Sequence, residues 1–217
     1  MIQQKIFSEI YNNNAWKNEE SKSGPGSTVK STFKLIDALP SIFQTFNIKS
    51  VLDLPCGDFN WMKTVPMDNI EYTGADIVSN MITNNSLKYP NVKFKVLDLL
   101  TDILPTVDLI ICRDCLVHFS NHDVKRALFN ICQSKSKYLL VTTFPNQVNN
   151  NISMGQWRAI NLQTDPFLFP EPITIINEKL DIKEYADKSM ALWSIDSINL
   201  ALARYLTQIH FGNIIHY

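Results

Sequence analysis

Short apolar segments alternate with helix-like segments along most of this chain of 217 residues, and this alternation constrains the fold more than any other feature. The apolar segments are rich in Val, Ile and Leu. With helices between them, such segments indicate βαβ units around a parallel sheet. Helices cover both faces of a parallel sheet, so continuous apolar runs are expected in its strands. The expected strands are residues 48–54, 70–77, 91–100, 107–114, 137–144, 173–180 and 189–195.

Helical periodicity and capping residues mark the segments between the strands. Ser27 is predicted to cap one helix, and Ser120 another, where Asp123 completes a capping-box-like pair. Pro40 is expected to break or restart the helix that Ser27 begins. The last two strands are joined by a short link, so we expect them to pair antiparallel. The expected helices are residues 2–10, 27–39, 78–89, 120–133 and 196–209.

Four of the expected strands carry an aspartate at or near their carboxyl ends. These residues are Asp53, Asp76, Asp98 and Asp114. A single aspartate there would indicate little, because aspartate favours turns. Four of them lie along one edge of a parallel sheet, which is where ligands bind in open α/β folds. A carboxylate at Asp76 can accept both hydroxyls of a ribose, Asp98 can bind an adenine amino group, and Asp53 can face an ammonium group.

Composition argues against several classes of partner. The net charge is −1 and the pI about 6.4, so the chain has no bulk basic field for binding nucleic acid non-specifically. No apolar run approaches the ~18 residues that span a bilayer, and the N-terminus does not resemble a signal peptide. We therefore expect a cytoplasmic protein without a membrane span. The CxxC pair Cys112 and Cys115 has no second pair at zinc-like spacing, so reduced thiols and no metal are expected.

Several motifs resemble those of the Rossmann-like S-adenosylmethionine-dependent methyltransferases. VLDLPCGD resembles their first motif, TGADI the second, VLDLL the third, and VDLIICRDCLVHF their fourth-strand segment. Pro55 and Phe59 stand where the usual Gly-x-Gly-x-Gly turn has glycines, and only Gly57 is kept. VLDLPCGDFNWM, CRDCLVHFS, QWRAINLQ and YADKSMALW are most similar to a group of bacterial and phage-borne methyltransferases.

The resemblance implies an α/β, Rossmann-like three-layer sandwich with a mostly parallel seven-stranded sheet and an antiparallel last strand. We expect a single methyltransferase domain over residues 1–217. Its expected parts are an N-terminal helical cap at 1–47, a cofactor-binding core at 48–144, a substrate loop at 145–172, and C-terminal strands and a helix at 173–217.

The cofactor implied by the resemblance is S-adenosylmethionine. Gly57 would let the backbone approach its methionine part, and Arg113 would hold a carboxylate of the cofactor or the substrate. The loop at 23–27 would either close over the cofactor beside Trp16 or serve as a simple connector. The expected cofactor-binding residues are Trp16, Asp53, Pro55, Cys56, Gly57, Asp76, Ile77, Asp98, Leu99 and Arg113.

Asp114 and His118 are the expected catalytic residues, since either could act as the general base that a hydroxyl acceptor needs. A structural role for His118 is the alternative. In the long loop, Trp157, Arg158 and Asn161 are expected to bind the substrate, although Trp157 could instead anchor the loop.

The expected function is methyl transfer to a hydroxyl, or an amine, of a small molecule or saccharide. The alternatives are a non-catalytic cofactor-binding subunit and a nicotinamide-dependent oxidoreductase, for which a fuller GxGxxG would be needed. The sequence leaves the acceptor and the oligomeric state open.

Overall fold

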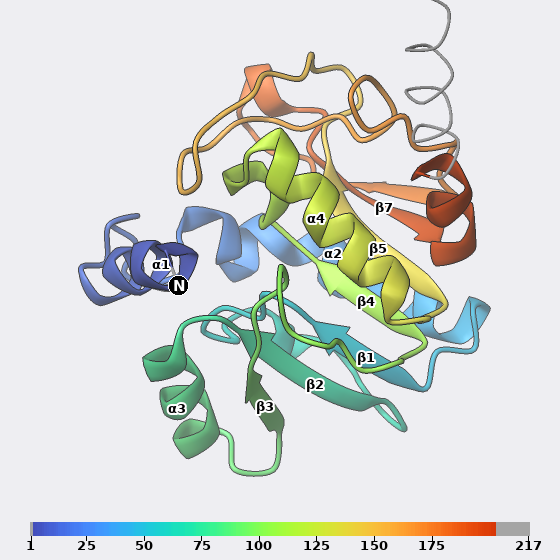
Figure 1. Ribbon diagram of the computed structural model, residues 1–217. Helices are drawn as coiled ribbons and strands as arrows, with labels where there is room; N and C mark the ends of the chain where they lie inside the picture. The colour runs from blue at the N-terminus through green and yellow to red at the C-terminus, as the bar shows by residue number, and fades with distance from the viewer. Residues whose placement is uncertain (1, 203–217) are drawn as a thin grey trace, which may run out of the picture.

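The structure, a computed structural model, describes residues 2–202 and is built around one seven-stranded sheet (Figure 1). The order of its strands is β3-β2-β1-β4-β5-β7-β6. The strands are β1 (Ser50–Asp53), β2 (Glu71–Asp76), β3 (Lys93–Val96), β4 (Leu109–Cys112), β5 (Tyr138–Thr143), β6 (Thr174–Asn177) and β7 (Ser189–Ser194).

The strands from β3 to β5 pair parallel, and β7 pairs antiparallel with both β5 and β6. The prediction of a mostly parallel, Rossmann-like sheet with an antiparallel last strand is confirmed. The expected antiparallel pairing of the last two strands is also confirmed. This topology places the carboxyl ends of β1, β2 and β4 along one edge, with β1 between the other two.

Helices cover the two faces of the sheet (Figure 1), and an apolar cluster lies on each face. Residues alternate between the faces along β4, so Ile110 packs toward α4 (Asn121–Gln133) while Leu109 and Ile111 pack toward α2 (Val29–Thr45). The α-helices are α1 (Ile2–Asn12), α2 (Val29–Thr45), α3 (Ser79–Lys88) and α4 (Asn121–Gln133). Residues 195–202 begin a further helix, and the rest of the helix expected at 196–209 lies outside the described residues.

The expectation that Pro40 breaks or restarts its helix was wrong. α2 continues through Pro40 to Thr45 and buries Ile42 and Phe43 beyond the proline. Burying such side chains contributes about 1.5–3 kcal/mol each, which offsets the missing hydrogen bond. The predicted cap was also one residue early, because the side chain of Thr28 accepts the capping hydrogen bond.

The capping pair predicted for α4 is confirmed. The Ser120 hydroxyl accepts from the Asp123 amide at 3.1 Å and donates to its carboxylate at 2.7 Å. The loop at 145–172 contains no helix or strand but is packed on the sheet, since the Phe144 amide donates to the Ile160 carbonyl at 2.7 Å. Within residues 2–202, no helix is both long and apolar enough to cross a membrane.

Candidate active site

A cavity of about 970 Å³, including its open mouth, lies at the carboxyl edge of the sheet. Asp53, Asp76, Asp98 and Asp114 all line it, so the sheet brings together the four acids that the sequence singles out. Helix α1 contributes Gln3, Phe7 and Tyr11 to the wall of the cavity. Every residue expected to bind the cofactor lines this cavity: Trp16, Asp53, Pro55, Cys56, Gly57, Asp76, Ile77, Asp98, Leu99 and Arg113.

Asp76 ends β2 and is held by the backbone around it. Its carboxylate accepts from the Gly57 amide at 3.3 Å and from the Val78 amide at 3.0 Å. Burial raises the pKa of Asp76 to about 6, although these hydrogen bonds work in the opposite direction. The side chain is therefore fixed in place beside the turn that carries Gly57.

Asp53 ends β1 and is only 2% exposed. Its Oδ2 accepts from the Tyr72 hydroxyl at 2.7 Å. Burial raises the pKa of Asp53 to about 7, and the Tyr72 hydrogen bond partly opposes this shift. Tyr72 is a site residue that the sequence reasoning missed, and only its position on the neighbouring strand could have indicated it.

Asp98 follows β3 and connects the sheet edge to the N-terminal helix. Its Oδ2 accepts from the Gln3 amide group at 2.7 Å and from the Thr101 hydroxyl at 3.1 Å. Its Oδ1 accepts from the Leu100 amide at 2.9 Å. Helix α1 therefore closes the cavity on the side of Asp98.

The first turn departs from the glycine-rich pattern and carries a contact of its own. Gly57 has a φ of +57°, and a Cβ on it would collide with the Ser23 hydroxyl. Phe59, where a glycine is usual, also has a positive φ of 58° and is buried against Tyr72. The absence of a side chain at Gly57 therefore lets the Ser23 side chain pack directly against this turn.

Residues 20–29, the N-terminal strap, lie over this turn. The Asp58 carboxylate accepts from the Ser21 hydroxyl at 2.9 Å, the Lys22 amide at 2.8 Å and the Ser23 hydroxyl at 3.3 Å. The Asn60 side-chain amide donates to the Glu20 carboxylate at 2.8 Å. Ser23 and Ser27 of the strap line the cavity, so the strap is part of its wall.

A buried cluster of charges follows β4. Arg113 forms two hydrogen bonds with Glu178, at 3.1 and 2.6 Å, and lies 3.1 Å from Asp114. Lys188 lies 2.6 Å from the Asp114 carboxylate and 3.3 Å from Glu178. Glu178 and Lys188 were missed in the sequence, although Lys188 lies in the YADKSMALW motif. Most of the charged contacts of Arg113 are therefore with carboxylates of the protein itself, Glu178 and Asp114.

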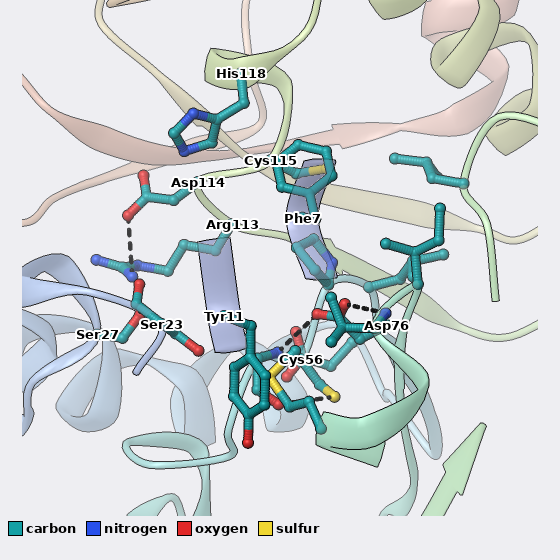
Figure 2. A pocket seen from close by; sticks show the side chains of 18 of the residues that line it. Phe7, Tyr11, Ser23, Ser27, Cys56, Asp76, Arg113, Asp114, Cys115 and His118 are labelled. Atoms are coloured by element: carbon teal, nitrogen blue, oxygen red, sulfur yellow. Dashed lines mark hydrogen bonds and ion pairs between the residues drawn. The ribbon is translucent and has the colours of Figure 1, made fainter. Parts of the chain in front are cut away.

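The two expected catalytic residues point into the same part of the cavity (Figure 2). Burial alone would raise the pKa of Asp114, but the charges of Arg113 and Lys188 lower it to about 2. The His118 Nδ1 lies 2.9 Å from the Gln156 carbonyl oxygen, and its ring stacks on Trp16. Burial lowers the pKa of His118 from its ordinary value.

The three residues expected to bind the substrate do not line the cavity. Arg158 is buried and donates to the carbonyls of Leu116 at 2.8 Å and Asn150 at 3.0 Å. Asn161 is also buried and donates to the Pro145 carbonyl at 2.7 Å. Trp157 is 44% exposed and packs edge-on against Phe144 and Tyr185. The hydrogen bonds of Arg158 and Asn161 stabilise the conformation of the loop.

The chain was compared with known protein families and solved structures. Residues 51–135 match the family described as a methyltransferase domain. The matched residues run from β1 to the end of α4 and include Asp53, Asp76, Asp98 and Asp114. No curated protein matches the chain. Between residues 2 and 202, no group of three or more His, Cys, Asp or Glu side chains could hold a metal ion.

Solved methyltransferases share the fold. The magnesium protoporphyrin IX methyltransferase ChlM from Synechocystis PCC 6803, solved with S-adenosylmethionine, has a TM-score of 0.59 at 12% identity, covering 88% of this chain and 96% of that one. An S-adenosylmethionine-dependent methyltransferase from Clostridium acetobutylicum ATCC 824 has a TM-score of 0.57 at 12% identity, covering 74% of this chain and 90% of that one. In two further comparisons this chain spans only 58% and 53% of the matched protein.

The cavity fits the cofactor of this class. Asp53, Asp76 and Asp98 line it at or just after the ends of three neighbouring strands, the edge at which ligands bind in open α/β folds. Phe7 and Tyr11 supply apolar surface from α1.

Proposed function

We propose that the protein transfers a methyl group from S-adenosylmethionine to a hydroxyl of a small molecule or saccharide, with an amine as the alternative acceptor. S-Adenosylmethionine supplies an activated methyl group on a sulfonium, which is displaced in line. In this proposal Asp53 binds the ammonium group, Asp76 the ribose and Asp98 the adenine. The whole chain, residues 1–217, would act as one methyltransferase unit.

The single observation that carries the choice of a hydroxyl acceptor is the environment of His118. A carbonyl oxygen can only accept a hydrogen bond, so the Gln156 carbonyl at 2.9 Å requires the proton on Nδ1. The neutral ring then has a lone pair on Nε2. Because burial lowers the pKa of His118, the ring is neutral near pH 7 and can take a proton from a hydroxyl.

Asp114 is better suited to orient the site than to accept a proton. A carboxylate with a pKa of about 2 is a weak base at neutral pH. Its ion pairs with Arg113 and Lys188 fix its position beside His118. We therefore assign the base to His118 and a positioning role to Asp114.

Titration calorimetry tests the cofactor assignment. We expect S-adenosylmethionine and S-adenosylhomocysteine to bind, NAD not to bind, and the Asp76→Ala variant to lose most of the affinity for both ligands. Unchanged binding in a folded Asp76→Ala variant would contradict the ribose assignment. Tight binding of NAD alone would favour the oxidoreductase alternative.

Acceptors are then screened by formation of S-adenosylhomocysteine, with sugars and small alcohols tested before amines. A hydroxyl acceptor should depend on His118, whereas an amine that arrives neutral should not. Cofactor binding without turnover of any acceptor would favour the non-catalytic alternative.

A further inference from the structure

The pair formed by Asp53 and Tyr72 joins two neighbouring parallel strands below the cavity. In the register of β1 and β2, Asp53 lies opposite Gly74, and Val51 lies opposite Tyr72. Tyr72 and Gly74 point to the same face, so the tyrosine reaches diagonally across to the carboxylate. Its hydroxyl donates to Asp53 Oδ2 at 2.7 Å.

The other carboxylate oxygen is left for a ligand. Among residues 2–202, Asp53 Oδ1 has no hydrogen-bond partner, and Asp53 lines the cavity. Burial raises the pKa of Tyr72 well above its ordinary value, so the hydroxyl stays protonated and can only donate to the carboxylate. The tyrosine ring is held in turn by Phe59, at a centroid distance of 5.3 Å.

We propose that Tyr72 positions Asp53 for the ammonium group of the cofactor by holding one carboxylate oxygen and leaving the other free. This inference rests on the proposed function, in which Asp53 binds the ammonium group. It adds a residue that the motif resemblance does not assign. A hydrogen bond to a carboxylate also favours its charged form, which is the form that attracts an ammonium group.

The surroundings of Asp53 oppose its ionisation, so the hydrogen bond from Tyr72 matters for its charge. Burial and the Asp76 charge raise the pKa of Asp53, whereas Tyr72 and Arg113 lower it, and the balance is about 7. The Cys56 thiol is the remaining titratable neighbour, and burial keeps it neutral by raising its pKa. Without the tyrosine hydroxyl, a larger fraction of Asp53 would be protonated at neutral pH and unable to pair with a cation.

The test compares two ligands in the Tyr72→Phe variant by titration calorimetry. S-Adenosylhomocysteine carries the ammonium group, and 5′-methylthioadenosine lacks the whole amino-acid part. We expect the variant to bind S-adenosylhomocysteine about 10-fold or more weakly at pH 7, as for the loss of a hydrogen bond to a charged group. Binding of methylthioadenosine should stay within about twofold, and the difference between variant and wild type should shrink from pH 6.5 to 8.5.

Tyr89→Phe is the matched control. Tyr89 packs on the same Phe59 ring at 5.1 Å but has no hydrogen bond to Asp53, so its variant should bind both ligands like the wild type. If Tyr72→Phe lost affinity for both ligands equally, the tyrosine would have a merely structural role and the inference would be overturned. Unchanged binding of S-adenosylhomocysteine would overturn it as well.

An Asp53→Asn variant separates this inference from the function on which it rests. If Asp53→Asn selectively lost affinity for S-adenosylhomocysteine and Tyr72→Phe did not, only the role of Tyr72 would be rejected. If Asp53→Asn leaves the preference between the two ligands unchanged, the ammonium assignment fails and the inference with it. If the wild type binds neither ligand, the proposed function itself is rejected.

Discussion

Asp53 and Asp114 show how two identical residues on neighbouring strands acquire opposite properties. Burial raises the pKa of Asp53 to about 7, although the Tyr72 hydroxyl opposes this rise, whereas the charges of Arg113 and Lys188 lower the pKa of Asp114 to about 2. One carboxyl therefore changes its charge near neutral pH, and the other stays ionised. The low pKa is why we assign a positioning role to Asp114, whereas Asp53 is assigned to the ligand because it lines the cavity with one carboxylate oxygen not bonded to Tyr72.

Replacing His118 with glutamine should lower kcat for a hydroxyl acceptor by about 10²–10⁴-fold, because no group then accepts the proton. The Kd for S-adenosylhomocysteine should change little. In the wild type, kcat at saturating cofactor should fall as the pH drops through the lowered pKa of His118, below about 6.5. His118→Gln should lack this acid limb. Full activity in the variant would exclude His118 as the base.

The N-terminal strap is the element whose role sequence reasoning left most open. It is attached to the turn that carries Gly57 by hydrogen bonds from and to side chains, and it buries little apolar surface, since Pro25 and Val29 are exposed. Segments held in this way open at low free-energy cost. Access to the cavity is therefore expected to depend on Asp58.

Replacing Asp58 with alanine should free the strap and speed tryptic cleavage after Lys22 by about 10-fold, because three hydrogen bonds to the strap are lost. Mass spectrometry of the fragments measures the rate. S-Adenosylhomocysteine should slow cleavage in the wild type more than in the variant. Asp68→Ala, at an exposed position with no hydrogen bond to the strap among residues 2–202, is the control. Equal cleavage rates in the two variants would contradict the role of Asp58.

Arg158 stabilises the loop at 145–172 through buried hydrogen bonds to backbone carbonyls. Replacing it with methionine should destabilise the protein by about 2–4 kcal/mol, because buried carbonyls lose their donors. Denaturant unfolding measures this loss. The Kd for S-adenosylhomocysteine should stay unchanged in the folded variant, since Arg158 does not line the cavity. A stable variant that lost only acceptor binding would support the substrate role expected from the sequence.

For the whole molecule, the buried acids predict an unusual dependence of stability on pH. Asp53 and Asp76 have folded pKa values of about 7 and 6, above the unfolded value near 4. At these two carboxyls the folded state binds more protons in this range, so stability should rise as the pH falls from 8 to 5, and the lowered pKa of His118 offsets part of this rise. Asp114 acts in the opposite direction below pH 4, where its lowered pKa makes the folded state resist protonation.

Thermal unfolding without ligand should therefore show a higher Tm at pH 5 than at pH 8. A gain of a few kcal/mol would raise Tm by several degrees in a chain of this size. In Asp53→Asn, which cannot titrate at this position, the rise should be smaller. A wild-type Tm that stays flat or falls between pH 8 and 5 would contradict the burial of uncompensated carboxylates.

The sequence by itself determined the order and type of the strands, because β-branched runs and their spacing are local properties. It also determined which residues lie at the ligand edge, since parallel strands place their carboxyl ends together. It failed at Pro40, where burial of Ile42 and Phe43 further along α2 outweighs a local helix breaker.

The tertiary structure decided the chemistry of the site. Arg113 meets Glu178 across 65 residues of chain, and Asp114 meets Lys188 across 74. Protonation states, the tautomer of His118 and the internal role of Arg158 all depend on such distant partners and on burial. These quantities are set by three-dimensional environment, which no local pattern in the sequence encodes.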